Sequence, residues 1–265
     1  MNKARLIEAT GPLAGASVVV TRPAATSSTL KRQIRALDGV AIGLPGMALR
    51  GADDVGAAKA ALRQARDADF VIFVSPNAVK FAWALRSLRF ARGTQVCAVG
   101  AATARALARH GVRKVVFPRE RADSEGLLAL PELQKLRGKR VALIGAPGGR
   151  ELLAQTLRAR LARLAEIHVY RRAAPRYSAR QLAALEHATA PLLTLLTSAE
   201  ALANLRAQLP LHLFARLAEG ELIVSSERLA ELARRSLFAN VHVATSPSPR
   251  HLLAATLQAL ARHRL

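Results

Sequence analysis

Small polar residues and glycines stand where predicted buried strands end and helices begin. Because the first turn of a helix has backbone N–H groups without intrahelical partners, such turns bind carboxylates and phosphates well. Several of these turns at one sheet edge would together bind a ligand with many negative charges. The candidate binding residues are Thr21, Arg22, Ser75, Asn77, Ala78, Gly100, Ala101, Ala102, Thr103, Gly145, Ser198, Ala199, Ser225 and Ser226.

Each of these residues also has a purely structural explanation. Ser75, for example, follows the apolar run Phe70 to Val74 and precedes Pro76, so it suits the N-cap of a helix that begins with proline. Taken singly, most of the hydroxyl residues are expected to be helix caps. Their shared position after strands is what favours a binding site.

Strands and helices are expected to alternate along the chain, which predicts an α/β fold with parallel sheets. Between Gly149 and Leu164 the leucine spacing predicts one long helix, and 211–218 is a short leucine-rich segment. The stretches 41–49 and 166–174 are predicted to be extended connectors. The expected strands are 17–20, 70–74, 95–99, 114–117, 139–144, 192–196, 221–225 and 241–244.

A weak internal repeat runs through this pattern. FVSPNAV at 73–79 matches LTSAEAL at 196–202, and VVVTRP at 18–23 matches VALIGA at 141–146, both with an offset of 123 residues. VGAATARAL at 99–107 matches VSSERLAEL at 224–232 with an offset of 125. Similar offsets in three separate places indicate two copies of one doubly wound α/β domain.

The two copies need not be contiguous in sequence. The connectors lie at equivalent places in the repeat, so they can pair as a two-stranded ladder between the domains. This predicts a first, discontinuous domain of residues 1–42 plus 173–265 and a second, inserted domain of residues 46–168. Residues 1–13 are expected to be a mobile N-terminal extension.

The composition excludes some classes of protein and leaves others open. With 51% apolar and 22% charged residues and no long apolar run, no membrane span is expected. The net charge of +22 permits nucleic-acid binding, but basic residues occur singly or in pairs and only 4% of residues are aromatic. We therefore expect solvated helix faces or attraction of a small polyanion, and no nucleic-acid partner. A single cysteine, Cys97, agrees with the reducing cytoplasm.

The usual catalytic signatures are missing from the sequence. It has no Walker loop, no CxxC and no HExxH, and its histidines lack metal-ligand spacing, so neither a metal nor another cofactor is expected. Cys97 lies within an apolar strand and is expected to be inert. Tyr170 stands on a connector, where it either packs at a strand edge or contributes to a site.

Several of these segments together resemble the uroporphyrinogen-III synthase family. They are VVVTRP, FVSPNAV, AVGAATARAL, the GGR turn at 148–150, VYRR at 169–172 and SSERLAEL, and their order and spacing extend over most of the chain. The resemblance implies two flavodoxin-like domains joined by a two-stranded β-ladder, with the active site in the cleft between them.

The resemblance also implies a reaction. Enzymes of this family dehydrate linear hydroxymethylbilane, which carries eight carboxylates, and close the ring with inversion of the D pyrrole to give uroporphyrinogen III for haem biosynthesis, without a cofactor. By position, Tyr170 is similar to the family's cleft tyrosine, which is implicated in loss of the hydroxyl, and Thr103 and Ser75 are similar to its cleft hydroxyls. Tyr170 and Thr103 are thus the catalytic candidates.

The implied partners are the tetrapyrrole substrate and hydroxymethylbilane synthase as its upstream donor, with a monomeric state. A non-catalytic module that binds a polyanion in the cleft between the domains is the alternative. The sequence departs from the family pattern at Ile144-Gly145, where Arg-Gly is common, and at Leu164-Ala165 and Ser236-Leu237, where a helix-ending glycine is common.

Overall fold

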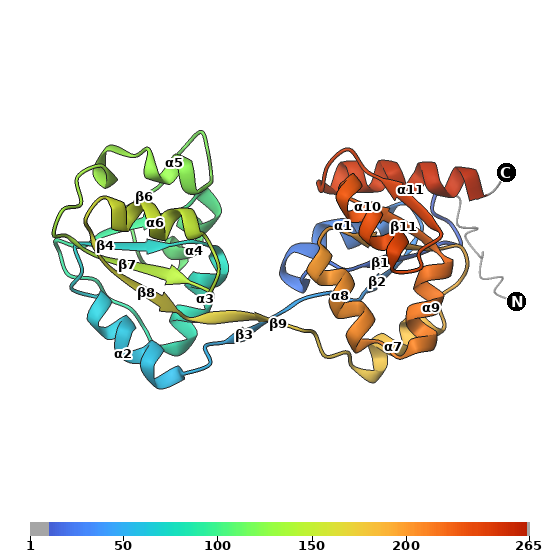
Figure 1. Cartoon of the computed structure of the whole chain (residues 1–265), viewed down its shortest axis with the longest axis horizontal. Coiled ribbons are helices and arrows are strands. Elements are labelled where there is room, and N and C mark those ends of the chain that lie inside the picture. Colours follow the sequence, from blue (N-terminus) through green and yellow to red (C-terminus); the bar gives the residue numbers. More distant parts are fainter. Residues whose placement is uncertain (1–10, 264–265) are drawn as a thin grey trace, which may run out of the picture. The chain divides into compact units, whose positions relative to one another are not determined.

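The computed structural model describes residues 11–263, which form two compact units joined by two passages of the chain (Figure 1). One unit runs to Ala48 and resumes at Ala173, and the other is Leu49–Arg172. The two passages, β3 (Ala48–Gly51) and β9 (Tyr170–Ala173), pair as a two-stranded sheet.

The first unit contains a five-stranded sheet in the order β12-β11-β10-β1-β2, and the pairs between neighbouring strands are parallel. Its elements are β1 (Ser17–Val20), α1 (Ala24–Ala36), β2 (Val40–Gly43), α7 (Ala179–Glu186), β10 (Leu192–Leu196), α8 (Ala199–Gln208), α9 (Leu211–Glu219), β11 (Glu221–Val224), α10 (Glu227–Arg235), β12 (Asn240–Val243) and α11 (Pro249–His263).

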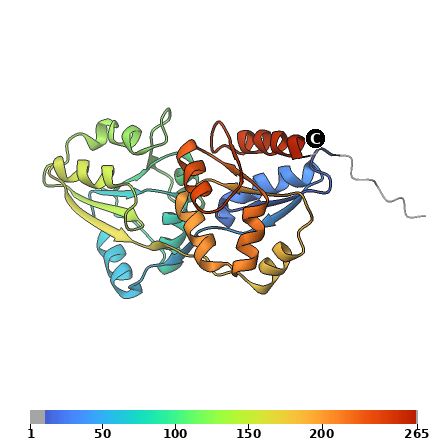
Figure 2. The same ribbon diagram turned by 45° about the vertical axis from the view of Figure 1, so that its right-hand side comes forward.

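The second unit contains a parallel sheet in the order β6-β5-β4-β7-β8. Figures 1 and 2 both show α2 on one side of this sheet and α5 and α6 on the other. Its elements are α2 (Val55–Ala65), β4 (Phe70–Phe73), α3 (Pro76–Leu85), β5 (Gln95–Ala98), α4 (Ala101–Arg109), β6 (Val115–Val116), α5 (Ser124–Leu128), a 3₁₀ turn (Pro131–Leu133), β7 (Arg140–Gly145), α6 (Glu151–Ala159) and β8 (Arg163–His168).

The strand orders explain the internal repeat. The repeat pairs β10 with β4, β1 with β7 and β11 with β5, and each pair occupies the same place in its sheet. Numbered along the chain, the strands of the first unit follow the flavodoxin order 2-1-3-4-5. The second unit has the same spatial arrangement, but its chain enters at the central strand, which gives the order 3-2-1-4-5. The prediction of two doubly wound parallel-sheet domains is confirmed.

The first sheet is buried on both faces, as a parallel sheet requires. Val18 and Val20 of β1 pack with helices α1 and α11, whereas Val19 points to the opposite face, which α7, α8, α9 and α10 cover. In the second unit Phe70–Phe73 is likewise fully buried. These buried apolar runs determine where the strands end, and therefore where the following helices begin.

The expected connectors are wrong in their bounds. Residues 40–43 form the edge strand β2, and Arg163–His168 forms the edge strand β8 of the second sheet, so the ladder itself begins only at Ala48 and Tyr170. An edge strand pairs on one side only, so its sequence alternates in polarity as a linking strand does. Because edge strands and linking strands look alike in sequence, both connectors were predicted with the wrong bounds.

Two further expectations need correction. Of the proposed mobile extension 1–13, residues 1–10 lie outside the described part, but Leu13 is fully buried and its N–H donates to the carbonyl of Leu37. The segment 211–218 is not merely a short segment, because it lies within helix α9, which packs through Leu213, Phe214 and Leu217.

The helix predicted for 149–164 ends early, at Ala159. Leu161 has a φ of 60°, and the N–H of Ala162 turns back to the carbonyl of Leu157. This left-handed residue ends the helix in the way that glycine usually does, so the missing helix-ending glycine corresponds to Leu161 and not to Leu164-Ala165. At the end of α10, Leu237 has a φ of 72° and is 82% exposed.

We predict that Leu237→Gly stabilises the protein by about 1 kcal/mol. A side chain in the left-handed region costs about 1–2 kcal/mol, and glycine removes this cost. Part of the gain is lost, because glycine makes the unfolded chain more flexible and so loses more conformational freedom on folding. Urea unfolding measures the difference. Leu211→Gly is the control: Leu211 is 84% exposed but is the first residue of α9, where glycine weakens the helix. Equal or lower stability of Leu237→Gly would contradict the prediction.

Candidate functional site

The join between β4 and α3 positions Ser75 at the carboxyl edge of the second sheet. Ser75 is the extended N-cap of α3, and its Oγ accepts a hydrogen bond of 3.1 Å from the N–H of Ala78. The same Oγ lies 3.2 Å from the hydroxyl oxygen of Tyr170. Ser75 therefore acts both as a cap and as a partner of the tyrosine.

Two contacts restrict the side chain of Tyr170, although the residue lies on a connecting strand. It begins β9, is only 8% exposed, and its ring stacks on that of Phe81 from α3, with centroids 5.2 Å apart and planes at 18°. Stacking and the Ser75 contact leave the phenol little rotational freedom. Phe81 was not among the predicted site residues; its signal in the sequence was the spacing of four residues from Asn77 on the same helix.

Only part of the α3 N-terminus is available to a ligand. Pro76 has no N–H, Ala78 donates to Ser75 Oγ, and Val79 donates to the carbonyl of Ser75. For Asn77 no hydrogen bond is recorded among the described residues. The helix cap already occupies the N–H of Ala78, so the expected ligand contact of Ala78 stays a prediction, and Asn77 has the less occupied N–H.

The α4 N-terminus is more open. Gly100 caps it without a side chain, and the backbone N–H groups of Ala101 and Ala102 have no recorded partner in the described part of the chain. A Cβ on Gly100 would lie 2.7 Å from that of Ala122, so close packing requires glycine here. Thr103, in the first turn, is 4% exposed, and no hydrogen bond is recorded for its hydroxyl within residues 11–263.

Close packing between strands explains why residue 145 is a glycine. It is the last residue of β7, pairs with His168 of β8, and accepts a hydrogen bond from the N–H of Val169. A Cβ there would lie 2.8 Å from the side chain of Val74. The assignment of Gly145 to substrate binding stays a prediction.

In the first unit, Thr21 and Arg22 follow β1. The Thr21 hydroxyl is buried and donates to the carbonyl of Leu195 at 2.7 Å, so a structural role accounts for it, and its assignment to substrate binding stays a prediction. The guanidinium of Arg22 donates to the carbonyl of Pro247, and partial burial lowers its pKa from the usual value. Arg22 keeps further donors for a carboxylate.

The other predicted residues of the first unit begin α8 and α10. Ser198 Oγ accepts from the N–H of Ala201 at 3.1 Å, which leaves the first N–H groups of α8, including that of Ala199. Ser226 caps α10 without a side-chain bond, and Ser225 precedes it. These are the same positions that Ser75 and Gly100 occupy in the second unit.

Ser246, Ser248 and His251, around the start of α11 in the first unit, were not among the predicted site residues. Ser246 Oγ lies 2.6 Å from Nδ1 of His251 and accepts from the N–H of Ser248, whose own Oγ accepts from the N–H of His251. These residues follow β12, so they extend the row of polar helix starts. The SPS spacing of Ser246 to Ser248 was the available signal.

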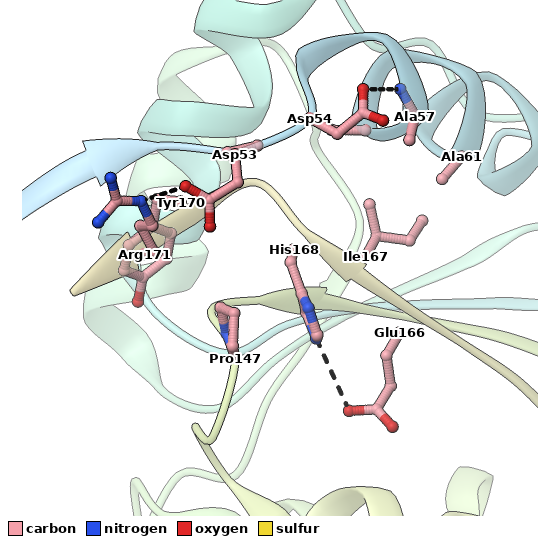
Figure 3. A pocket seen from close by; sticks show the side chains of 12 residues that line it. Asp53, Asp54, Ala57, Ala61, Pro147, Glu166, Ile167, His168, Tyr170 and Arg171 are labelled. Carbon is pink, nitrogen blue, oxygen red and sulfur yellow. Dashed lines mark hydrogen bonds and ion pairs between the residues drawn. The ribbon is translucent and has the colours of Figure 1, made fainter. Parts of the chain in front are cut away.

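A pocket of about 310 Å³ lies within the second unit and borders Tyr170 (Figure 3). Its lining is mixed, with several alanines beside three acidic residues: Asp53 pairs with Arg171, Asp54 caps α2, and Glu166 lies 4.0 Å from His168. Because the arginine of the lining already pairs with a carboxylate, the pocket is a poorer receptor for carboxylates than the helix starts are.

Within residues 11–263, no group of histidine, cysteine and acidic residues is arranged to hold a metal ion. No helix in the same range is long and apolar enough to cross a membrane. Cys97 is buried, and desolvation raises the pKa of its thiol to about 12. Its expected inertness agrees with this environment.

Known proteins match this chain over most of its length. A family model described as "Uroporphyrinogen-III synthase HemD" matches residues 28–254. The uroporphyrinogen-III synthase of Escherichia coli K12 is 32% identical over 90% of this chain and 99% of its own length. That of Salmonella typhimurium LT2 is 34% identical, again over 90% of this chain and 99% of its own.

Solved structures agree on the fold. A uroporphyrinogen-III synthetase from Helicobacter pylori 26695 superposes with a TM-score of 0.55 at 16% identity, covering 92% of this chain and 99% of that one. A mutant uroporphyrinogen III synthase from the extremely thermophilic bacterium Thermus thermophilus gives 0.54 at 18% identity, covering 93% and 99%. Sequence and fold together show that the chain belongs to the uroporphyrinogen-III synthase family.

Proposed function

We propose that this protein, as a cyclising lyase of tetrapyrrole biosynthesis, converts hydroxymethylbilane to uroporphyrinogen III with Tyr170 assisting the loss of water. Family membership supports the reaction. The observation that carries the assignment of Tyr170 is its 3.2 Å contact with Ser75 at the start of α3. The site residues support a mechanism of proton donation and positioning.

The first step is departure of the hydroxyl as water. The Ser75 Oγ already accepts a hydrogen bond from Ala78, so its own proton can point to the phenol oxygen of Tyr170. Tyr170 then keeps its proton for the leaving hydroxyl, and the helix dipole favours the developing phenolate. Breaking the C–O bond leaves a cationic azafulvene. Tyr170 is the catalytic residue here and Ser75 its positioning residue.

The second step is ring closure at the substituted position of the last pyrrole. Because uncatalysed closure gives the other isomer, the enzyme must hold the chain folded. The unpaired N–H groups at the starts of α3, α4, α8 and α10 are proposed to bind substrate carboxylates, with Arg22 adding a charged donor. The Thr103 hydroxyl is proposed to contact the substrate beside the α4 amides.

The partner, the oligomeric state and the cellular location of the protein are proposed on the same basis. Hydroxymethylbilane is short-lived as a linear chain, which favours direct supply by hydroxymethylbilane synthase. A monomer suffices for the reaction, because all the proposed groups come from one chain. The single, buried Cys97 agrees with a cytoplasmic location, and the proposed steps need no cofactor.

We predict that the purified protein, given freshly made hydroxymethylbilane, yields the type III isomer. Chromatography of the oxidised products separates type III from type I, and a reaction without protein measures spontaneous closure. Tight binding of the bilane with only type I product would instead select the non-catalytic binding module.

Replacing Tyr170 by phenylalanine is expected to lower turnover about 10- to 100-fold, because the proton donor is lost while the ring still stacks on Phe81. Tyr177→Phe is the matched control. Tyr177 also donates a hydrogen bond, to the carbonyl of Pro45, and burial raises its pKa to about 12, but it lies outside the proposed site. Initial rates of type III formation compare the two; equal rates would reduce Tyr170 to packing.

Ser75→Ala is expected to lower turnover about tenfold and to cost about 1 kcal/mol of unfolding free energy through the lost cap. Ser178→Ala removes a comparable serine cap, at α7, and should cost similar stability without slowing the reaction. Ser75→Thr keeps the hydroxyl and should restore most of the rate. If both alanine variants slow the reaction equally, the effect is one of stability.

A further inference from the structure

Most of the positive charge of the second unit gathers at one edge of its sheet. The segments 86–94, 109–114, 135–140 and 158–163 lead into β5, β6, β7 and β8, and they contain thirteen lysines and arginines with no aspartate or glutamate. The remaining segment at this edge, 66–69 before β4, adds one arginine and two aspartates. Because these strands are parallel, all four segments lie at the amino end of the sheet. We call them together the basic edge.

The fold alone does not require this charge. In the first unit the segments at the same sheet edge are 35–39, 186–191, 216–220 and 234–239, and they hold four arginines against three acidic residues. Basic residues that merely complement helix C-termini would be expected equally in both units. The excess therefore reflects something particular to the second unit.

Little of the charge on the basic edge is neutralised within the protein. Lys139 and Arg140 lie near Asp69, at 4.0 and 3.8 Å, and Arg158 pairs with Glu166. Arg89 and Arg113 are exposed, and no ion pair is recorded for either in the described part of the chain. Such unpaired, mutually repelling charges lower stability unless something binds them.

The basic edge is also hollowed. One pocket of about 270 Å³ is lined by Arg63, Arg66, Arg86 and Arg89, and the buried side chains of Leu62 and Leu88 also line it. A second, of about 390 Å³, combines Lys135 and Arg137 with Leu161. Leu161 is 51% exposed in its left-handed conformation, so an apolar group stands among the cations.

We infer that the basic edge docks an acidic face of a partner protein. Ten of the thirteen basic residues are arginines, the charged residue that is enriched in protein interfaces. The exposed Leu161 adds an apolar contact, for which a phosphate backbone has no use. Large apolar side chains exposed in the described part are valine and leucine, so no aromatic platform for bases exists there. A second copy of this chain, with a net charge of +22, would be repelled.

This inference goes beyond the proposed reaction. The basic edge lies at the amino end of the strands, whereas Ser75 and Gly100 follow the carboxyl ends of β4 and β5 in the same unit. A partner bound there leaves the residues proposed for catalysis in this unit uncovered. Binding and turnover are therefore separate measurements on the same protein.

The test uses three fluorescent probes: a peptide of seven Glu-Glu-Leu repeats, a peptide of seven Glu-Glu-Ser repeats, and a 20-base-pair DNA duplex. Fluorescence anisotropy should show the Leu peptide bound at least threefold more tightly than the Ser peptide. The double variant Arg89→Glu/Arg113→Glu should weaken binding about tenfold, since like charges then face the probe. Leu161→Ser should remove the preference for the Leu peptide.

The control is Arg32→Glu/Arg235→Glu, which reverses two exposed arginines of the first unit and should change peptide affinity less than threefold. Both double variants should keep the wild-type rate of product formation, and the thermal midpoint of Arg89→Glu/Arg113→Glu should not fall below that of the wild type, because the reversal relieves repulsion within the basic edge. Equal losses in the two variants would reduce the effect to net charge. Tighter binding of the duplex than of either peptide would assign the surface to nucleic acid; either result overturns the inference.

Discussion

A parallel strand that runs into a helix leaves unpaired N–H groups at one edge of the sheet, and the rest of this structure depends on how they are satisfied. The protein fills some of them itself: Ser75, Asp123 and Ser198 each accept a bond from the third residue of their helix. Gly100 and Ser226 make no such bond. The proposed carboxylate receptor thus consists of the donors that capping leaves over.

In the second unit, the positively charged side chains do not lie at the sheet edge where the proposed carboxylate receptor lies. The turns after β4 and β5, 74–79 and 99–104, contain no charged residue, while the opposite edge of the same sheet is strongly basic. Backbone dipoles at the carboxyl edge have fixed directions and lose little freedom on binding, whereas flexible arginine side chains would lose more. The substrate contacts proposed for this unit are backbone donors, so the charge of the basic edge lies outside the proposed site.

The sequence predicted those parts of the fold and of the site that follow from local burial and backbone pattern. Phe70–Phe73 is apolar throughout, and the neighbours of Ser75 predict its helix cap. The end of α6 was misplaced because Leu161 stands where glycine usually marks it. Whether the Thr21 hydroxyl is free to bind a ligand depends on the carbonyl of Leu195, which is 174 positions away in the sequence. The contact between Ser75 and Tyr170 joins residues 95 positions apart, and no local pattern specifies it, because it depends on how β9 leaves the sheet.

The duplication offers a way to separate function from architecture. The offset of 123 residues aligns Ser75 with Ser198, and both cap their helices in the same way. It aligns Tyr170 with Met47, which has no hydroxyl. A feature that both copies share, such as the serine cap, is explained by the fold. The tyrosine and the basic edge occur in one copy only, so the fold that the two copies share does not require them, and the proposed chemistry and the proposed partner binding account for them.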